Sequence, residues 1–438
     1  MLKVVKFGGS SLADAAQFEK VRQIITADPA RRVVVVSAPG KRFSADHKIT
    51  DLLYLCYAHL QYGVSAEGVF SMVVERYRSI VADCGLSADI DKEFLALYEK
   101  MQQGISQDEL VSRGEYFAAR LMAEYLGFDF LDAAEWLQFS FDGQIDREHS
   151  YEALRRIAED RSVVIPGFYG VMPDGHIKVL SRGGSDVTGA LAAAALGADV
   201  YENWTDVSGF LVTDPRIVKD PEVISTITYR ELRELSYMGA TVLHEDSIFP
   251  LRQEGIPIHV LNTNAPQDPG TMIVENTCSK PKFTITGIAG KKGFASITVE
   301  KSMMNTEIGF GRKVLGVFED NNLSFEHMPS GIDTMTVFVH QNEFAEKEQQ
   351  VIAGLHRAVQ PDSIDLESDL ALIAVVGRGM RRTRGTAGRI FSALAHKNIN
   401  VKMIDQGSSE LNIIIGVAND DFETAIKAIY DIFVITRL

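Results

Sequence analysis

Short apolar runs rich in valine and isoleucine alternate with helical patterns over the first 280 of the 438 residues. The runs LKVVKF, RRVVVVSA, VVIPGFYG and PIHVLN are typical of buried β-strands. Stretches between them, such as DAAQFEKVRQII, GEYFAARLMAEYL and GALAAAALGA, have the spacing of helices. This alternation predicts an α/β domain over residues 1–280, with helices on both faces of a mostly parallel sheet. Residues 51–105 are expected to be helical and to form a lobe beside the sheet.

The simple alternation of strands and helices ends at Pro281, and two units of similar βαββαβ layout follow. The first unit covers residues 294–368, with strands expected at FASITVEK, LSFEHMPS, DTMTVFVHQ and DSIDLE. The second covers residues 369–438, begins with the strand LALIAVVG, and is one strand short. The orphan strand FTITGIA lies before the first unit and supplies the missing one in our prediction. We therefore expect two interleaved domains, one formed by residues 294–368 and the other by residues 281–293 with 369–438.

The composition limits the possible partners. A formal net charge of −15 argues against nucleic acid and anionic membranes, both of which require a basic surface. The three cysteines have no metal-like spacing with histidine, so we predict free thiols in a reducing compartment and no resident metal. No stretch reaches the roughly 18 apolar residues of a membrane helix, and the N-terminus enters a strand directly. We expect a cytoplasmic protein.

A pair of glycines stands where the first strand gives way to a helix. The motif KFGGSS carries Lys6, Gly8, Gly9 and Ser10. Glycines let a backbone approach a ligand closely, and the free amides of a helix N-terminus suit an anion. We therefore expect a phosphate site, with a tight turn beside a surface lysine as the alternative. The lysine precedes the glycines, so the motif differs from a Walker loop.

A second glycine pair lies in LSRGGSDVTG, before the alanine-rich helix. Arg182 precedes the glycines, and Ser185 and Asp186 follow them. An ordinary helix start with Ser185 as its cap explains the serine and the aspartate. It does not explain the arginine or the glycines, so a phosphate or carboxylate site is the second interpretation.

Two further stretches concentrate charged and hydroxyl side chains. SRGE is expected to open a helix, which would place Glu115 in the first helical turn. There the positive end of the helix dipole stabilises a carboxylate. NWTDVSGFLVTDPR gathers Thr205, Asp206, Asp214 and Arg216 around a glycine. Turns capped by aspartate side chains would explain this loop, and so would a nucleotide site beside the phosphate turns.

In this order, the motifs KFGGSS, VVSA, SRGE, GFYG, LSRGGSD, WTDVSGFLVTDPR and GATVLHEDSIFPL resemble those of the aspartate kinases in the amino-acid kinase family. The two C-terminal units resemble the paired ACT domains of these enzymes, and the resemblance covers essentially the whole chain. It implies transfer of the ATP γ-phosphate to the side chain of L-aspartate, giving 4-phospho-L-aspartate. That reaction is the first step of lysine, threonine and methionine biosynthesis, under amino-acid feedback.

The resemblance also implies roles for individual residues. Lys6 would stabilise the transferring phosphoryl group with Gly8, Gly9 and Ser10, and Asp186 would orient Lys6, with Mg²⁺ bridging the ATP phosphates. Arg182 would hold the α-carboxylate of aspartate, and Glu115 would receive its ammonium group. Four further residues would line that pocket: Ser37, Thr50, Phe168 and Ser185. Four would lie on the nucleotide side: Thr205, Asp206, Asp214 and Arg216.

One position departs from the family pattern, because Thr241 stands where many relatives have a lysine that contacts the nucleotide. In the ACT region, five residues resemble effector-site positions: Met304, Asn305, Ser330, Asp333 and Thr334. The resemblance implies lysine or threonine as the effector, with lysine preferred, and a homodimer or a higher homo-oligomer. Simple packing between domains would also explain these segments.

Two other functions remain open at this point. The chain could be another amino-acid kinase, or an amino-acid-sensing protein with impaired catalysis, a reading that only Thr241 favours. A dehydrogenase does not fit, because Arg382 in GRGMRR occupies the third glycine position of the dinucleotide fingerprint.

Overall fold

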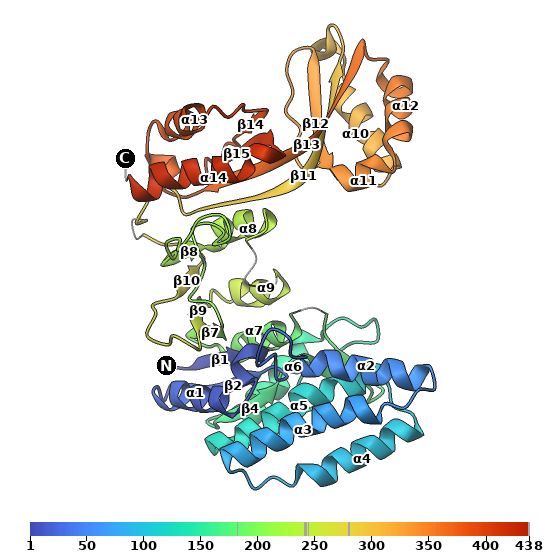
Figure 1. The fold of residues 1–438 in the computed structure, drawn as a ribbon, viewed down its shortest axis with the longest axis vertical. Coiled ribbons are helices and arrows are strands. Elements are labelled where there is room, and N and C mark those ends of the chain that lie inside the picture. The colour runs from blue at the N-terminus through green and yellow to red at the C-terminus, as the bar shows by residue number, and fades with distance from the viewer. Residues whose placement is uncertain (182, 241–242, 244, 279–280, 437–438) are drawn as a thin grey trace. The chain divides into compact units, whose positions relative to one another are not determined.

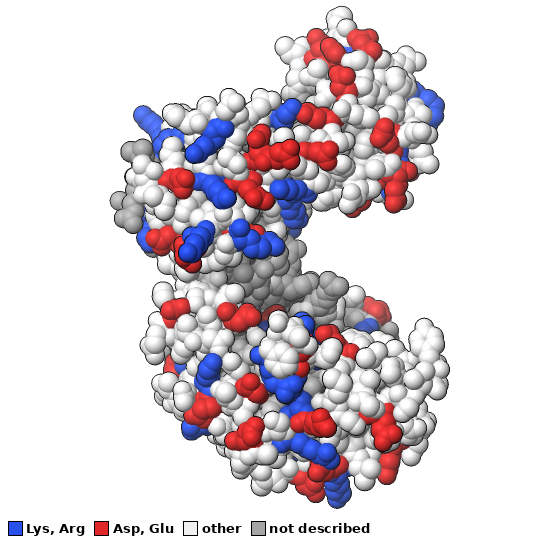
Figure 2. Space-filling model, viewed as in Figure 1, with Lys and Arg blue, Asp and Glu red and all other residues white. Residues whose placement is uncertain are grey.

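The computed structural model describes residues 1–181, 183–240, 243, 245–278 and 281–436 (Figure 1). These residues form two compact units. The N-terminal unit comprises Met1–Phe210, Ser225–Tyr229 and Val242–Thr277, and the C-terminal unit comprises Leu211–Ile224, Arg230–Thr241 and Cys278–Leu438. This division differs from the boundary expected at residue 280, and the domain ranges given above stay a prediction. Figure 2 shows acidic and basic side chains interspersed over the visible face of each unit.

An eight-stranded sheet in the order β3-β4-β2-β1-β7-β9-β10-β8 forms the middle of the N-terminal unit. The predicted parallel arrangement is confirmed for β3, β4, β2, β1, β7 and β9, whereas β10 runs antiparallel to β9. The strand bounds are β1 Lys3–Phe7, β2 Arg31–Val36, β3 Asp129–Phe130, β4 Val163–Pro166, β7 Val200–Thr205, β8 Thr226–Thr228, β9 Ile258–Asn262 and β10 Thr271–Val274. A separate hairpin joins β5 Tyr169–Val171 to β6 Ile177–Val179.

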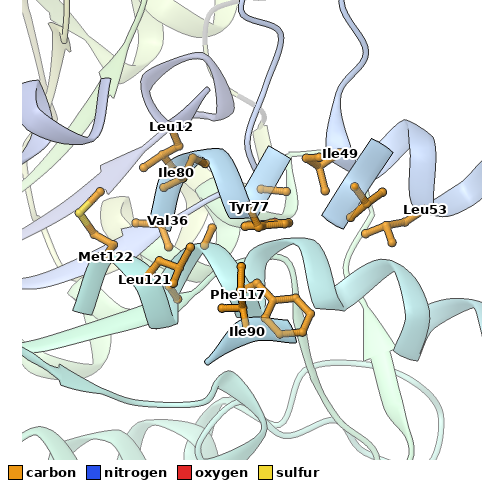
Figure 3. Close-up of a cluster of buried hydrophobic side chains, with 14 of the residues drawn as sticks. Leu12, Val36, Ile49, Leu53, Tyr77, Ile80, Ile90, Phe117, Leu121 and Met122 are labelled. Atoms are coloured by element: carbon orange, nitrogen blue, oxygen red, sulfur yellow. The ribbon is translucent and has the colours of Figure 1, made fainter. Parts of the chain in front are cut away.

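Eight helices described in this unit surround the sheet: α1 Ala15–Thr26, α2 Ile49–Gln61, α3 Glu67–Cys84, α4 Ile90–Gln103, α5 Gln107–Leu126, α6 Arg147–Ala158, α7 Gly184–Leu196 and α9 Glu245–Gln253. The expected helical region over residues 51–105 is confirmed by α2, α3 and α4. With α1 and α5 these helices enclose an apolar core on one face of the sheet (Figure 3). Tyr77 of α3 and Phe117 of α5 meet in it, with ring centroids 5.7 Å apart.

The alternation of side chains along β1 decides which residues face the opposite side. Val5 and Phe7 belong to the core shared with α1 to α5. Because successive side chains point to opposite faces, Lys6 projects to the other side, where α7 packs against β1. The alanine side chains of α7 are buried and small, so the helix lies close to the sheet. The lysine is thereby directed toward the start of α7.

The C-terminal unit contains a five-stranded antiparallel sheet in the order β12-β11-β13-β15-β14. Its strands are β11 Gly287–Glu300, β12 Thr334–His340, β13 Ser363–Val376, β14 Met403–Asp405 and β15 Asn412–Ala418. The helices described with it are α8 Tyr229–Tyr237, which begins in the N-terminal unit, α10 Phe310–Asp320, α11 Gln341–Ala345, α12 Glu348–Val359, α13 Thr386–His396 and α14 Phe422–Tyr430. No helix among the described residues of the chain is long and apolar enough to span a membrane.

Two long strands run through both halves of this sheet. β11 begins at Gly287, so it takes in only the last three residues of the strand expected at FTITGIA, and it continues through FASITVEK to Glu300. DSIDLE and LALIAVVG, also expected as separate strands, merge into β13. The first part of β11, up to Lys292, pairs with the second part of β13, and the register shifts around Gly293, which has a φ of +91°. The strand expected at LSFEHMPS is wrong, because this segment makes only isolated bridges at His327 and Ser330. Proline, as at position 329, lacks the amide that a ladder requires.

Helix α8 is attached to this sheet by a buried ion pair. Glu231 is fully buried, and its carboxylate accepts hydrogen bonds from the Thr286 hydroxyl at 2.5 Å and the Arg378 backbone at 2.8 Å. The Arg378 guanidinium also lies 2.9 Å from the same carboxylate.

Candidate active site

Lys6 lies near the carboxyl end of β1 and forms a largely buried ion pair. Its Nζ is 2.6 Å from Oδ1 of Asp186, which lies in the first turn of α7, and the two side chains are 9% and 18% exposed. The same Oδ1 accepts a hydrogen bond of 2.9 Å from Nδ2 of Asn203 on β7. The sequence predicted that Asp186 orients Lys6, and the two side chains do meet. Asn203 was missed, because a polar residue inside a strand does not reveal its partner.

The glycine turn after β1 is built by close backbone contacts. The Gly8 amide donates to the Trp204 carbonyl at 3.0 Å, and the Gly9 carbonyl accepts from the Gly40 amide at 2.7 Å. A Cβ atom on Gly9 would lie 2.8 Å from the Ala38 carbonyl oxygen, a distance that real side chains essentially never show. Gly9 is therefore needed for this approach, as the sequence suggested. Ser10 follows in a 3-10 turn, Gly9–Leu12, and is half-buried.

Gly40, in the loop after β2, is a second residue of the site that the sequence did not reveal. A Cβ atom on it would lie 2.6 Å from the Gly9 carbonyl carbon, so the loop after β2 presses directly on the glycine turn. Arg76 of α3 holds this loop, because its guanidinium donates to the Gly40 carbonyl at 2.8 Å and pairs with Asp46 at 2.6 Å. The run SAPG after a buried strand was the available signal for such a close turn.

The start of α7 supplies the second turn. The helix begins at Gly184 after Gly183, which has a φ of +75°, and no side chain caps it. The expectation that Ser185 is an ordinary cap is therefore wrong, because Ser185 already lies inside the helix and is buried. The amides of this first turn point along the helix dipole toward the Lys6 side of the sheet. Arg182 lies outside the described residues.

Phe168 follows β4 in a strained conformation, with a φ of +80°. Its amide donates to the Thr188 hydroxyl of α7 at 3.0 Å. A Cβ atom on Gly184 would come within 2.7 Å of the Phe168 ring, so the ring packs directly on the first residue of α7. A positive φ is rare for an aromatic residue and marks a position that the surroundings hold in place. The neighbouring Gly167 also packs on Ser185, which brings the end of β4 to the same turn.

Glu115 occupies a different place from the one expected. Helix α5 begins at Gln107 with Ser106 as its cap, so Glu115 lies in the middle of the helix and not in its first turn. It is 4% exposed, and burial raises its pKa to about 8, although a hydrogen bond from the Ala38 backbone acts in the opposite direction. Its Oε2 is buried without a hydrogen-bond partner among the described residues. A buried, incompletely paired carboxyl fits a cationic ligand.

Ser37 and Thr50 flank the loop that presses on the glycine turn. Ser37 directly follows β2, and its amide donates to the Phe7 carbonyl at 3.2 Å. Thr50 is the second residue of α2, which is tied to the loop through the Ile49 amide and the Pro39 carbonyl at 3.1 Å. Both are half-buried. The backbone contacts therefore place Ser37 beside the carboxyl end of β1, at the edge where Lys6 also lies.

The residues expected on the nucleotide side divide between the two units. Thr205 ends β7, and its hydroxyl donates to the exposed carboxylate of Asp206 at 3.1 Å. Asp214 and Arg216 belong to the C-terminal unit, where their side chains pair at 2.6 Å and this pairing lowers the pKa of Asp214. Thr241 lies outside the described residues. The described part of the chain has no group of three acidic, histidine or cysteine side chains that could hold a metal.

The segments expected to bind an effector lie together in the C-terminal unit. The Met303 amide donates to the Asp333 carboxylate at 2.8 Å, and the Asn305 amide donates to the Ile332 carbonyl at 3.1 Å. Met304 is buried in the core beside β11. Asn305, Ser330, Asp333 and Thr334 are exposed.

Known proteins resemble this chain over most or all of its length. Residues 1–262 match the model of the amino acid kinase family, and residues 373–433 match an ACT domain. Aspartokinase 3 of Bacillus subtilis is 40% identical, over 99% of this chain and 98% of its own length. The crystal structure of an aspartate kinase from Clostridium acetobutylicum is 48% identical, with a TM-score of 0.89 and 99% of each chain covered.

A second similar structure contains ligands. Aspartokinase III of Escherichia coli, in complex with lysine and aspartate, is 25% identical, with a TM-score of 0.72, and the match covers 98% of this chain and 99% of that one. The matches to the amino acid kinase model and to the Bacillus subtilis protein extend over most or all of the chain. The chain therefore belongs to the aspartate kinases of the amino acid kinase family.

Proposed function

We propose that the cluster around Lys6 carries out phosphoryl transfer from ATP to the side-chain carboxylate of L-aspartate, giving 4-phospho-L-aspartate and ADP. The observation that carries this proposal is the buried pair of Lys6 and Asp186, set between two glycine turns at the carboxyl edge of a parallel sheet. Ligands of open α/β sheets bind at this edge. The amides of the glycine turn and of the first turn of α7 are donors suited to phosphate oxygens.

The reaction needs positioning and charge stabilisation more than proton transfer. The aspartate side chain is ionised near neutral pH, so one of its oxygens attacks the γ-phosphorus without a general base while the bond to ADP breaks. Negative charge on the transferring group is stabilised by Lys6, which Asp186 holds in place until ATP binds. Mg²⁺ enters with the ATP phosphates as part of the substrate and neutralises some of their charge.

The substrate amino acid would be held by charged groups of opposite sign. We assign its ammonium group to Glu115, whose unpaired buried oxygen supports this role. Arg182 would bind the α-carboxylate, because a guanidinium suits bidentate contact with a carboxylate. The pocket would be completed by four side chains, Ser37, Thr50, Phe168 and Ser185.

The nucleotide would contact Thr205 and Asp206 at the end of β7. The nucleotide-side roles of Asp214 and Arg216, which belong to the C-terminal unit, stay predictions from the family resemblance. An effector would bind at the segments of Met304, Asn305, Ser330, Asp333 and Thr334. Lysine is the preferred effector and threonine the second, because lysine is bound in the related Escherichia coli structure. A homodimer through the ACT domains and a cytoplasmic location stay predictions.

The residue-level proposal is tested by Lys6→Ala. Loss of one electrostatic group at the transferring phosphoryl should lower kcat by at least ~10². Lys20→Ala is the matched control, because Lys20 lies on the surface of α1 and contacts only Asn264 among its described hydrogen bonds. Near-normal kcat in Lys6→Ala would remove Lys6 from the mechanism. A wild-type protein that binds lysine without any turnover would instead favour an amino-acid sensor.

A further inference from the structure

Asn203 is a buried polar residue in the central part of the sheet. It is 3% exposed and lies directly opposite Lys6 in the parallel register of β1 and β7. Its neighbour Trp204 points to the other face, where its ring stacks on Phe7 with centroids 6.0 Å apart. Asn203 therefore shares the α7 face of the sheet with Lys6. A buried amide is costly unless it is hydrogen-bonded, so its contacts indicate what it does there.

The Asn203 side chain donates to the same carboxylate oxygen that Lys6 contacts. Oδ1 of Asp186 lies 2.9 Å from the amide nitrogen and 2.6 Å from the lysine Nζ. One oxygen thus receives a neutral donor from β7 and a cation from β1. When Lys6 turns toward a phosphoryl oxygen, Asp186 loses its cation in a site that admits little water. The amide then remains as its hydrogen-bond donor.

We propose that Asn203 is a positioning residue for phosphoryl transfer, which holds the Asp186 carboxylate so that Lys6 can leave it for the phosphoryl group. The inference rests on the function proposed above and assigns no contact between Asn203 and either substrate. Asn203 fixes the direction from which Asp186 presents its oxygen to Lys6. It also lowers the cost of separating the ion pair, because hydrogen bonds to a charged group are stronger than neutral ones.

The charged and titratable groups around this amide are few and identifiable. Lys6 faces it from β1 and Asp186 faces it from α7, and the Tyr201 hydroxyl donates to the Asp186 backbone carbonyl at 3.4 Å. Glu202 pairs instead with Lys3 and Arg31, within 2.9 Å of each. A change at Asn203 therefore acts first on the pair of Lys6 and Asp186.

The test compares Asn203→Ala, Asn203→Asp and Tyr201→Phe in the full-length protein, with kcat and both KM values measured between pH 6 and 9. Asn203→Ala should lower kcat by about 10-fold or more, the effect of losing a hydrogen bond to a charged group, while the KM values for aspartate and ATP change less than about 3-fold. Tyr201→Phe removes a contact to the Asp186 backbone and keeps the ring, so its kcat should stay within about 3-fold of wild type.

Asn203→Asp gives the most specific readout. Two carboxyl groups that share a site cannot both ionise easily, so the new carboxyl should be protonated at low pH and then donate to Asp186 as the amide does. The kcat of Asn203→Asp relative to wild type should therefore rise as the pH falls from 9 to 6, while the ratio for Asn203→Ala stays flat. A residue that served only to fill the fold would not produce this recovery.

Three outcomes would overturn the inference: a normal kcat in Asn203→Ala, parallel pH profiles for the alanine and aspartate variants, or an equal loss in Tyr201→Phe. Thermal melting of each variant checks that it is folded. If the alanine variant unfolds, the change in kcat of Asn203→Asp between pH 9 and pH 6 still decides the test. Failure of the proposed function has a different signature, because the wild-type protein would then show no turnover on aspartate at any pH.

Discussion

The proposed contact between Glu115 and the substrate ammonium group predicts that the binding of aspartate depends on a proton. Burial raises the pKa of this carboxyl to about 8, so about 90% of the sites are protonated at pH 7 in the free protein. Only the ionised carboxylate pairs with the ammonium group of the substrate. Binding should therefore release about 0.9 proton per site at pH 7, and this number should fall through about 0.5 at pH 8 toward zero at higher pH as the free carboxyl becomes ionised.

Calorimetric titration with L-aspartate in two buffers of different ionisation enthalpy measures this proton release. Glu115→Gln should abolish the release and weaken aspartate binding, whereas Glu109→Gln, a half-buried residue of the same helix that pairs with Lys100, should leave the release unchanged. Tight binding of aspartate by the wild-type protein at pH 7 with no proton released would refute the assignment of Glu115 to the ammonium group.

The same shift predicts how stability varies with pH. The pKa of Glu115 is higher in the folded protein than in the unfolded chain, so the buried carboxyl opposes folding once the unfolded chain ionises, above about pH 4.5. At pH 7, which is about 2.5 units above the ordinary glutamate pKa, keeping Glu115 protonated in the folded protein lowers the free energy of unfolding by about 3 kcal/mol. Glu115→Gln should raise the melting temperature at pH 7 in the absence of ligand, with a gain that shrinks toward pH 4.5. A gain independent of pH would contradict this reasoning.

Three other perturbations follow from contacts in the two units. Gly9→Ala should lower kcat at least ~10-fold, because its methyl group would displace the loop after β2. Gly68→Ala on α3 is the control that should be tolerated, because its methyl group would meet no neighbouring side chain within 4 Å, and steady-state kinetics on both variants would decide. Arg378→Met should destabilise the C-terminal unit by about 2 kcal/mol, because it removes the guanidinium that lies 2.9 Å from the buried Glu231 carboxylate, and an unchanged denaturant midpoint would contradict this. Asp333→Ala should raise the lysine concentration needed for half inhibition several-fold and leave kcat unchanged, as inhibition curves would measure. The same half-inhibition concentration as in the wild-type protein would exclude Asp333 from the effector site.

The parts of the fold that depend on side-chain type could be predicted from the sequence. Valine-rich runs form the central strands, and the alanine-rich stretch forms helix α7, as expected. The two long strands could not be anticipated, because a residue such as Gly293 is compatible with a turn and also with a bulge inside one strand. Pairing with a distant partner decides between these outcomes.

The candidate site shows a similar division. Lys6 and the glycines were recognisable because cations and glycines at a strand end are typical of anion sites. Glu115 lies in the middle of α5 and not in its first turn, because Ser106, three residues before Glu109, caps the helix and gives it an earlier start. The roles of Asn203 and Gly40 depend on contacts between segments far apart in the chain, and neither residue carries a local signal of its partner.

The central claim is that this chain phosphorylates aspartate through the Lys6 site. The most direct measurement traps acyl phosphate with hydroxylamine in the presence of ATP and Mg²⁺, with aspartate, glutamate or acetylglutamate as the acceptor, for the wild-type protein and for Lys6→Ala. We predict hydroxamate from aspartate alone, suppressed by lysine, and a loss of at least ~10² in the variant. Equal product from glutamate or acetylglutamate, or full activity in Lys6→Ala, would contradict the account.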